Sequence, residues 1–432
     1  MLKRIPISDV ELGMFVHKME GSWLKHPFWK FRFMLDDPQV LQDLKSSELE
    51  SVIINTAKGK DFKPTASTGE LQAGDRGSLI SRYREPEVKQ SASRAASLKN
   101  RTPIDLQSTD PVSLQNEIGN SQVIADKAQM EVGKVFLDAR LGKAINMHTI
   151  EPVVKDIFAS VQRNGQAFSG LMRCKLNNAF VYRHSMAVSA LMVSLAMRMK
   201  LTPNQIRDAG LAGMFLDIGT MQLPQDLTPP NGDFRNVDPQ IWRRHVGLGH
   251  FALERAGGIT QPVLDACLQH HERVDGTGFP QGLPGHEIAQ IARMAAICDT
   301  FDYLLTDSDE GRGLDPAAAI VRLQDMDGAF DPDILRAFIE CIGIYPVGSF
   351  VHLRSKRLAM VIDHKSSQMT TPVVRVFYSL VNHQRVIEHT VDLASSSVDD
   401  KIIGVADLSG LVLPEAAQLR ELIFLGAHQL AK

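Results

Sequence analysis

The sequence contains few cysteines, and they are not arranged in pairs. Cys174, Cys267, Cys298 and Cys341 are spread over a chain of 432 residues and form no C-x-x-C motif. This spacing argues against a disulfide framework and against a zinc–cysteine knot, and it is typical of proteins from a reducing compartment. We therefore predict a cytoplasmic protein.

Long apolar runs are also missing. The N-terminal sequence MLKRIPISDVELGMF has no apolar core of the roughly 7–15 residues that a secretory signal needs. No stretch approaches the roughly 20 apolar residues of a membrane span. The apolar run at 186–197 contains serines and is bounded by Arg183 and Arg198, so we predict a buried core helix there. No membrane span is expected.

The chain has no large excess of charge of either sign. Its formal net charge is −3, with 22% charged and 44% hydrophobic residues. Such a composition is ordinary for a soluble globular protein. Nothing in this balance points to a nucleic-acid polymer as a partner.

The order of residue patterns predicts a multidomain, mainly α protein. Residues 1–62 combine β-like runs with one helix-like run and predict a small α+β domain. Residues 63–118 are rich in Ser, Lys, Pro and Gly, which is typical of a partly disordered linker. Residues 119–345 predict a helical bundle, and residues 346–432 predict a short β-rich appendage that ends in a helix.

Two of these segments carry more detailed expectations. The small domain contains an aromatic cluster with Trp23, Phe28 and Trp29, next to Pro27. These rings form either the core of that domain or a docking face for a partner. In the helical segment, apolar residues recur at i, i+3, i+4 and i+7 in at least seven successive runs with short connections, which predicts a bundle.

Histidines and aspartates in the helical segment are candidates for a metal site. The candidate residues are His184, Asp217, His245, His270, His271 and Asp299, and each helix contributes only one or two of them. Facing helices of a bundle can bring such side chains together. Imidazoles with carboxylates suit Fe, Mn, Zn or Ni. A carboxylate can also bridge two cations about 3.5–4 Å apart. The alternative is that each histidine is simply a core or surface residue, the class to which His250, His286 and His428 are assigned.

The sequence HHERVDGTGFP is more specific than any single histidine. It places His270 and His271 at a helix end, followed by a tight turn at Asp275, Gly276 and Gly278, which Pro280 closes. This stretch resembles the HHExxDGxGYP signature of the HD-GYP domains, the branch of the HD superfamily that hydrolyses cyclic di-GMP with bound metal. The resemblance extends over about 120–350, and the N-terminal segment is similar to the small domain that often precedes HD-GYP.

The resemblance implies roles for the candidate residues. His184, Asp217 and Asp299 would bind one cation, together with a histidine that this chain lacks. Asp217 would bridge to a second cation that is held by His245, His270 and His271. Iron or manganese is implied, with zinc or nickel as alternatives. Asp217, Glu272 and Asp275 would be the catalytic set, the last two by supporting the site and shaping the substrate mouth.

Several positions depart from the family pattern. Leu216 replaces the histidine of the HD pair and cannot bind metal, while Thr220 replaces a lysine that could hold phosphate. Phe279 replaces the tyrosine of GYP. Asn178 and Ala179 replace acidic residues, and no RPYR-like run follows the last helix.

Two functions therefore stay open. The first is a phosphodiesterase with impaired activity, which hydrolyses cyclic di-GMP to pGpG or GMP with a metal-activated water. The second is a non-catalytic cyclic di-GMP sensor or docking regulator. The expected partners are cyclic di-GMP, diguanylate-cyclase-type or other signalling proteins, and a second copy of the chain in a homodimer.

Overall fold

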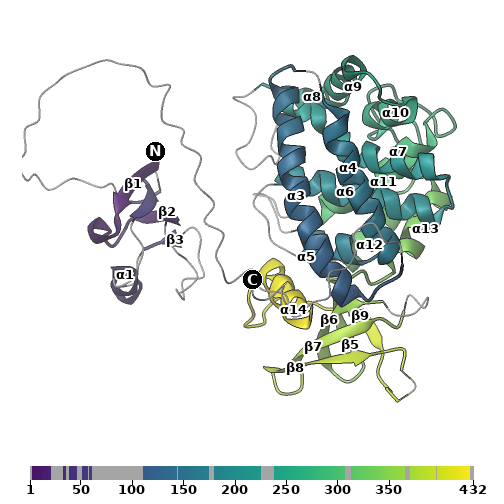
Figure 1. Ribbon diagram of the computed structural model, residues 1–432. Helices are drawn as coiled ribbons and strands as arrows, with labels where there is room; N and C mark the ends of the chain where they lie inside the picture. The colour runs from purple at the N-terminus through teal and green to yellow at the C-terminus, as the bar shows by residue number, and fades with distance from the viewer. Residues whose placement is uncertain are drawn as a thin grey trace, which may run out of the picture. The chain divides into compact units, whose positions relative to one another are not determined.

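The computed structural model consists of two units, Met1–Lys89 and Gln90–Lys432, which are described separately (Figure 1). The described residues are 2–20, 33–35, 38–45, 51–56, 58–60, 110–143, 145–174, 180–224, 238–306, 313–364, 370–395 and 397–428. Trp23, Pro27, Phe28 and Trp29 lie outside them, so the two interpretations of that aromatic cluster both stay predictions.

The N-terminal unit has the α+β character that its residue pattern predicts. Its elements are β1 (Leu2–Pro6), η1 (Ile7–Asp9), β2 (Phe15–Glu20), β3 (Phe33–Met34), α1 (Pro38–Lys45) and β4 (Ser51–Asn55). The strands form one antiparallel sheet in the order β1-β4-β2-β3. Alternate residues of β4, Val52 and Ile54, are fully buried and pack with Ile5 and Met14 in a small separate core.

The second unit is mainly helical, which confirms the predicted fold class. Its bundle contains α3 (Leu114–Arg140), α4 (Met147–Arg163), α5 (Ala167–Cys174), α6 (Phe180–Arg198), α7 (Pro203–Phe215), η3 (Ile218–Gln222), α8 (Pro239–Trp242), α9 (His245–Ala256), α10 (Gln261–Gln269), α11 (Gln290–Leu304), α12 (Pro316–Gln324) and α13 (Pro332–Ile342).

Side-chain caps define several of these helix starts. Ser113, Thr202, Asp315 and Asp331 each accept a backbone N–H at the start of α3, α7, α12 and α13. Such caps pair N–H groups that have no partner within the helix. Because Ser113 caps α3, this helix begins at Leu114, inside the segment predicted as linker. The domain boundaries themselves stay predictions.

Helix α6 is the central helix of the bundle. Residues 184–196 are all buried, because α6 packs against α3, α4, α5, α7, α11 and α13. This confirms the buried core helix predicted around 186–197. Among the described residues, no helix is long and apolar enough to cross a membrane.

The C-terminal strands form a second antiparallel sheet. The strands are β5 (Phe350–Leu353), β6 (Arg357–Asp363), β7 (Val373–Ser379), β8 (Gln384–Asp392) and β9 (Ile402–Val405), in the order β8-β7-β6-β5-β9. The predicted C-terminal helix is α14 (Ala416–His428). Figure 1 shows the sheet and α14 at the end of the bundle where α5 lies. Phe350, Phe377 and Phe424 belong to the same hydrophobic core as the bundle helices, so sheet and bundle are packed as one unit.

Candidate metal centre

The six candidate ligands meet where five helical segments converge. His184 lies on α6, Asp217 follows α7, His245 begins α9, His270 and His271 follow α10, and Asp299 lies on α11. The segment after Asp217 approaches α9 very closely. A Cβ atom on Gly219 would lie 2.0 Å from the carbonyl oxygen of His245. Glycine is therefore required at 219 to hold Asp217 beside the start of α9.

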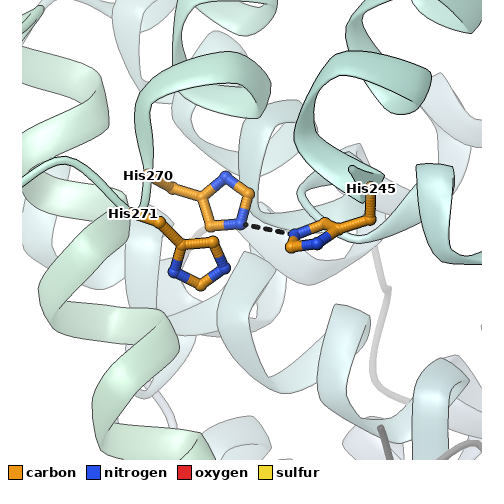
Figure 2. A group of neighbouring side chains, drawn as sticks. All are labelled: His245, His270 and His271. Carbon is orange, nitrogen blue, oxygen red and sulfur yellow. Dashed lines mark hydrogen bonds between the residues drawn. The ribbon is translucent and has the colours of Figure 1, made fainter. Parts of the chain in front are cut away.

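Three histidines form one half of the site. Figure 2 shows the rings of His270 and His271, which are adjacent in the chain, beside the ring of His245 from another helix. The Nε2 atoms of His245 and His270 are 3.4 Å apart. Nitrogen atoms of all three rings lie within 4.8 Å of one another. This spacing is small enough for one cation to contact all three rings.

The hydrogen bonds of two rings decide which nitrogen is free. His245 Nδ1 lies 2.7 Å from the carbonyl oxygen of Trp242, and His270 Nδ1 lies 3.0 Å from that of Cys267. A carbonyl only accepts, so both Nδ1 atoms carry the proton. The Nε2 atom of each ring is therefore the nitrogen that can act as a metal ligand, and Figure 2 shows the two Nε2 atoms facing each other.

His271 is held by aromatic neighbours. Its ring stacks on Phe279 with centroids 4.8 Å apart and lies 4.7 Å from the Trp242 ring. Its Nε2 atom is buried without a hydrogen-bond partner. Burial lowers the pKa of His271 well below its usual range, and the neighbouring histidines and Arg243 lower it further. Burial also lowers the pKa of His270, to about 4. Both rings are therefore neutral at pH 7, which is the form that binds metals.

Carboxylates form the other half of the site. His184 Nε2 lies 3.0 Å from Asp299 Oδ1 and 3.5 Å from Asp217 Oδ2, while its Nδ1 lies 2.8 Å from Asp302 Oδ2. Burial opposes a charge on this ring, but the hydrogen bonds to Asp299 and Asp302 outweigh burial and raise the pKa of His184 well above its usual range. Asp302 was not among the predicted residues. It lies one turn beyond Asp299 on the same face of α11, a spacing that the sequence already contains.

Asp217 lies between the two halves. Its Oδ1 is 3.4 Å from His245 Nε2 and 3.8 Å from His270 Nε2, whereas its Oδ2 faces His184. One carboxylate thus presents one oxygen to each half. The structure divides the six residues into the two groups that the resemblance implies, although their roles as ligands stay a prediction.

The donor atoms fit a divalent transition metal. Imidazole nitrogens and carboxylate oxygens converge, and the Nε2 atom of His271 is buried without a hydrogen-bond partner. Buried polar atoms are normally paired. Such a donor set suits Fe, Mn, Zn or Ni better than Mg or Ca. The structure therefore contains candidate metal-binding groups, and it leaves the metal's identity open.

Glu272 and Asp275 shape the turn beside the site. Both oxygens of Glu272 accept backbone N–H groups, from Gln281 and Leu283. Asp275 accepts from Thr277 and pairs with Arg273, and these hydrogen bonds lower the pKa of its carboxyl group below the usual range. The described contacts of both carboxylates are with the turn and not with an imidazole. This arrangement fits the supporting role predicted for them and provides no direct catalytic contact.

Two residues that depart from the family pattern, Leu216 and Thr220, are buried. Leu216 is 1% exposed and packs in the hydrophobic core of the bundle. Thr220 is also 1% exposed, and its hydroxyl donates to the carbonyl oxygen of Asp217. Thr220 is therefore unable to contact a ligand in solvent. Asn178 and Ala179 lie outside the described residues.

Comparisons with known proteins agree with this fold. A family model described as HD domain matches residues 172–334, and one described as a domain of unknown function, DUF3391, matches residues 2–150. The cyclic di-GMP phosphodiesterase PA4108 of Pseudomonas aeruginosa is 37% identical over 405 residues, which cover 94% of this chain and 92% of the relative. The chain therefore belongs to the HD-GYP family of HD-domain proteins, which confirms the resemblance.

More distant relatives share only part of the chain. The cyclic di-GMP phosphodiesterase response regulator RpfG of Xanthomonas campestris pv. campestris is 29% identical over 147 residues, 34% of this chain and 39% of its own. The 3'3'-cGAMP-specific phosphodiesterase 1 of Vibrio cholerae is 30% identical over 125 residues, 29% of each chain. The names of these relatives include two different cyclic dinucleotides.

Proposed function

We propose that this chain is a metal-dependent phosphohydrolase that binds cyclic di-GMP and hydrolyses it, with impaired turnover, to pGpG or GMP. The observation that supports it most directly is the convergence of Asp217 with the Nε2 nitrogens of His245 and His270. Three relatives that carry this domain are named as cyclic dinucleotide phosphodiesterases. The relative that aligns along most of the chain is named for cyclic di-GMP, which favours that substrate.

In this proposal the three-histidine half holds the functional cation. His245, His270 and His271 would supply ring nitrogens, and Asp217 would supply an oxygen. Iron or manganese is the expected metal, with zinc or nickel as alternatives. When bound, such a cation polarises a phosphate oxygen and lowers the pKa of a water. Burial keeps His270 and His271 neutral, backbone carbonyls orient His245 and His270 through Nδ1, and Trp242 and Phe279 pack against the ring of His271.

The carboxylate half is proposed to bind its cation weakly. His184, Asp217 and Asp299 offer three ligands, and Leu216 removes the fourth that the family resemblance implies. Loss of a residue that only supports a ligand already weakens a metal site by about 10–100-fold, and loss of a ligand weakens it more. A pair of cations would stabilise both the attacking and the leaving oxygen, whereas one cation would not stabilise both. Turnover below that of intact relatives is the expected result.

The second candidate function is a sensor or docking regulator without turnover. Leu216 and Thr220 favour this function. Both side chains are buried, so position 216 supplies no metal ligand and position 220 supplies no cation. Its partners would be other cyclic di-GMP signalling proteins or a second copy of the chain. A cytoplasmic location is part of both proposals, and the four free cysteines support a reducing compartment.

A turnover assay separates the two functions. The protein is purified without oxygen, its metals are measured by mass spectrometry, and the iron- or manganese-loaded form is incubated with cyclic di-GMP or 3'3'-cGAMP. Formation of pGpG or GMP that disappears in His270→Ala would support the hydrolase. Tight binding of cyclic di-GMP with no product would favour the sensor. Purified protein that takes up no transition metal would contradict the metal site in both.

A further inference from the structure

The site has an arginine at its rim that neither the motifs nor the family pattern singled out. Arg243 follows the short helix α8, and its guanidinium carbon lies 4.7 Å from the centre of the Phe279 ring. That ring in turn stacks on His271. Phe279 therefore connects the guanidinium to the three-histidine half through two ring contacts.

The Arg243 side chain is exposed to solvent. Among the residues that the structure describes, no carboxylate pairs with its guanidinium. Two other cations near the site already have partners. Arg273 is paired with Asp275, and Arg183 donates to the Thr306 hydroxyl. A guanidinium held on an aromatic face keeps its in-plane N–H groups available for a phosphate.

The negative charge of a bound cyclic dinucleotide favours a further cation beside the site. Asp217, Asp299 and Asp302 place three carboxylates around His184, and a cyclic dinucleotide adds two phosphodiester charges. The lysine that the family resemblance implies near this point is Thr220, which is buried and bonded to the backbone. A cationic side chain that complements the bound metal would therefore come from another element, and α8 is adjacent to the three-histidine half through Trp242.

We propose that Arg243 binds one phosphodiester group of the substrate at the three-histidine end of the site, held in place by Phe279. The proposal rests on the proposed function for the identity of the nucleotide, but the contact itself requires only a phosphodiester. Arg243 supplies a charge-assisted hydrogen bond from a rigid fork. It thereby replaces, from a different segment, the cation that is missing at position 220.

The chain offers a matched control in the next residue. Arg244 carries the same charge, is also exposed and caps no backbone group with its side chain. Among the described residues it has no ring contact. Arg243→Gln and Arg244→Gln therefore remove the same charge from neighbouring positions, and only the first removes a group that is placed on Phe279. Arg243→Lys keeps the charge and loses the planar fork.

The test measures equilibrium binding of two probes to the metal-loaded full chain. The probes are cyclic di-GMP and bis(4-nitrophenyl) phosphate, a phosphodiester without a base, and each is titrated by calorimetry. Arg243→Gln should weaken both by about tenfold, Arg244→Gln by less than about twofold, and Arg243→Lys by an intermediate factor. Metal content, measured by mass spectrometry, should be the same in all four proteins.

The outcomes separate the Arg243 proposal from the proposed function. Unchanged binding in Arg243→Gln, or an equal loss in Arg244→Gln, would overturn the proposal and leave the proposed function standing. If the protein binds bis(4-nitrophenyl) phosphate in an Arg243-dependent way but does not bind cyclic di-GMP, the Arg243 contact is supported. The assignment of cyclic di-GMP as the ligand is then wrong. A metal-loaded wild-type protein that binds neither probe would overturn both.

Discussion

The two halves of the site differ in the protonation state that they favour for their histidines. In the three-histidine half, burial keeps His270 and His271 neutral, with lowered pKa values, and backbone carbonyls orient the free nitrogens. In the carboxylate half, Asp299 and Asp302 raise the pKa of His184. The surroundings therefore favour neutral rings in the first half and a protonated His184 in the second half.

This difference shows what one substitution does in a paired site. In the proposed assignment, Leu216 leaves the carboxylate half with three ligands, and a protonated His184 would balance part of the negative charge of Asp217, Asp299 and Asp302 without a metal. The hydrogen bonds of His245 and His270 do not involve Leu216, so we expect the loss to be confined to the carboxylate half.

Removal of one ring from the intact half should have the largest effect. His270→Ala takes away one nitrogen and leaves Asp217 and His245 without their shared partner, so metal retention should fall by at least about a hundredfold and turnover with it. His250→Ala is the control, since His250 lies on α9 but outside the cluster. Metal analysis and product formation measure the effect. Equal metal content in wild type and His270→Ala would mean that the cation binds elsewhere.

Restoring the ligand of the damaged half should have the next largest effect. Leu216→His should allow a second cation to bind and raise turnover by about tenfold or more. Without metal the same change should destabilise the fold by about 1–3 kcal/mol, because it buries an imidazole in an apolar core. Leu216→Gln is the control, with a polar group but no imidazole.

Metal stoichiometry and the metal-dependent shift of Tm measure this prediction. A second cation without a gain in turnover would show that other departures, such as Thr220, also limit catalysis. No second cation at all would contradict the assignment of His184, Asp217 and Asp299 as a ligand group.

Much of this fold could be predicted from residue patterns. The helices α3, α4, α6, α7, α10, α11, α12 and α13 and the strands β6, β7 and β8 have clear periodicity and were predicted, whereas apolar spacing did not identify α5, α8 or α9. Strands β5 and β9 have four residues each, too few to show a period of two, and they were missed. The shared core of sheet and bundle depends on contacts between distant residues such as Gly170 and Phe424, and no local pattern contains that information.

The site was predicted in part. The candidate residues came from unusual residue types near helix ends, and their division into two groups came from the family resemblance. Asp302 was missed although its spacing from Asp299 was visible. The roles of Trp242 and Arg243 had no such signal, because Trp242 orients His245 through its backbone carbonyl and Arg243 acts through a ring contact.

The pH dependence of metal binding should distinguish the two halves. Metal binding at the carboxylate half must displace the proton of His184, whose pKa is raised, so in Leu216→His the affinity for the second cation should rise by about tenfold per pH unit until pH passes that pKa. At the three-histidine half the pKa of His270 is about 4. That ring is neutral well above pH 4, so its protonation should contribute little to the pH dependence of the affinity for the first cation between pH 6 and 8.

Asp302→Asn provides the control for this pH dependence. It removes the negative charge at Nδ1 of His184, so the pKa of His184 should fall and the tenfold dependence should become shallower. Metal titrations at several pH values measure both affinities in one protein. A dependence of equal steepness for both cations would contradict the contrast between the halves.

The smallest effect is expected from restoring the tyrosine of the family signature. Phe279→Tyr keeps the ring that stacks on His271 and supports Arg243, and it adds only a hydroxyl at a partly exposed position. Metal affinity should therefore change by less than about twofold, because the ligand rings keep their packing. Phe279→Leu, which removes the ring, should weaken phosphodiester binding as Arg243→Gln does. If Phe279→Tyr alone raised turnover to the level of Leu216→His, the limiting loss would lie in the three-histidine half, and the contrast between an intact and a damaged half would be wrong.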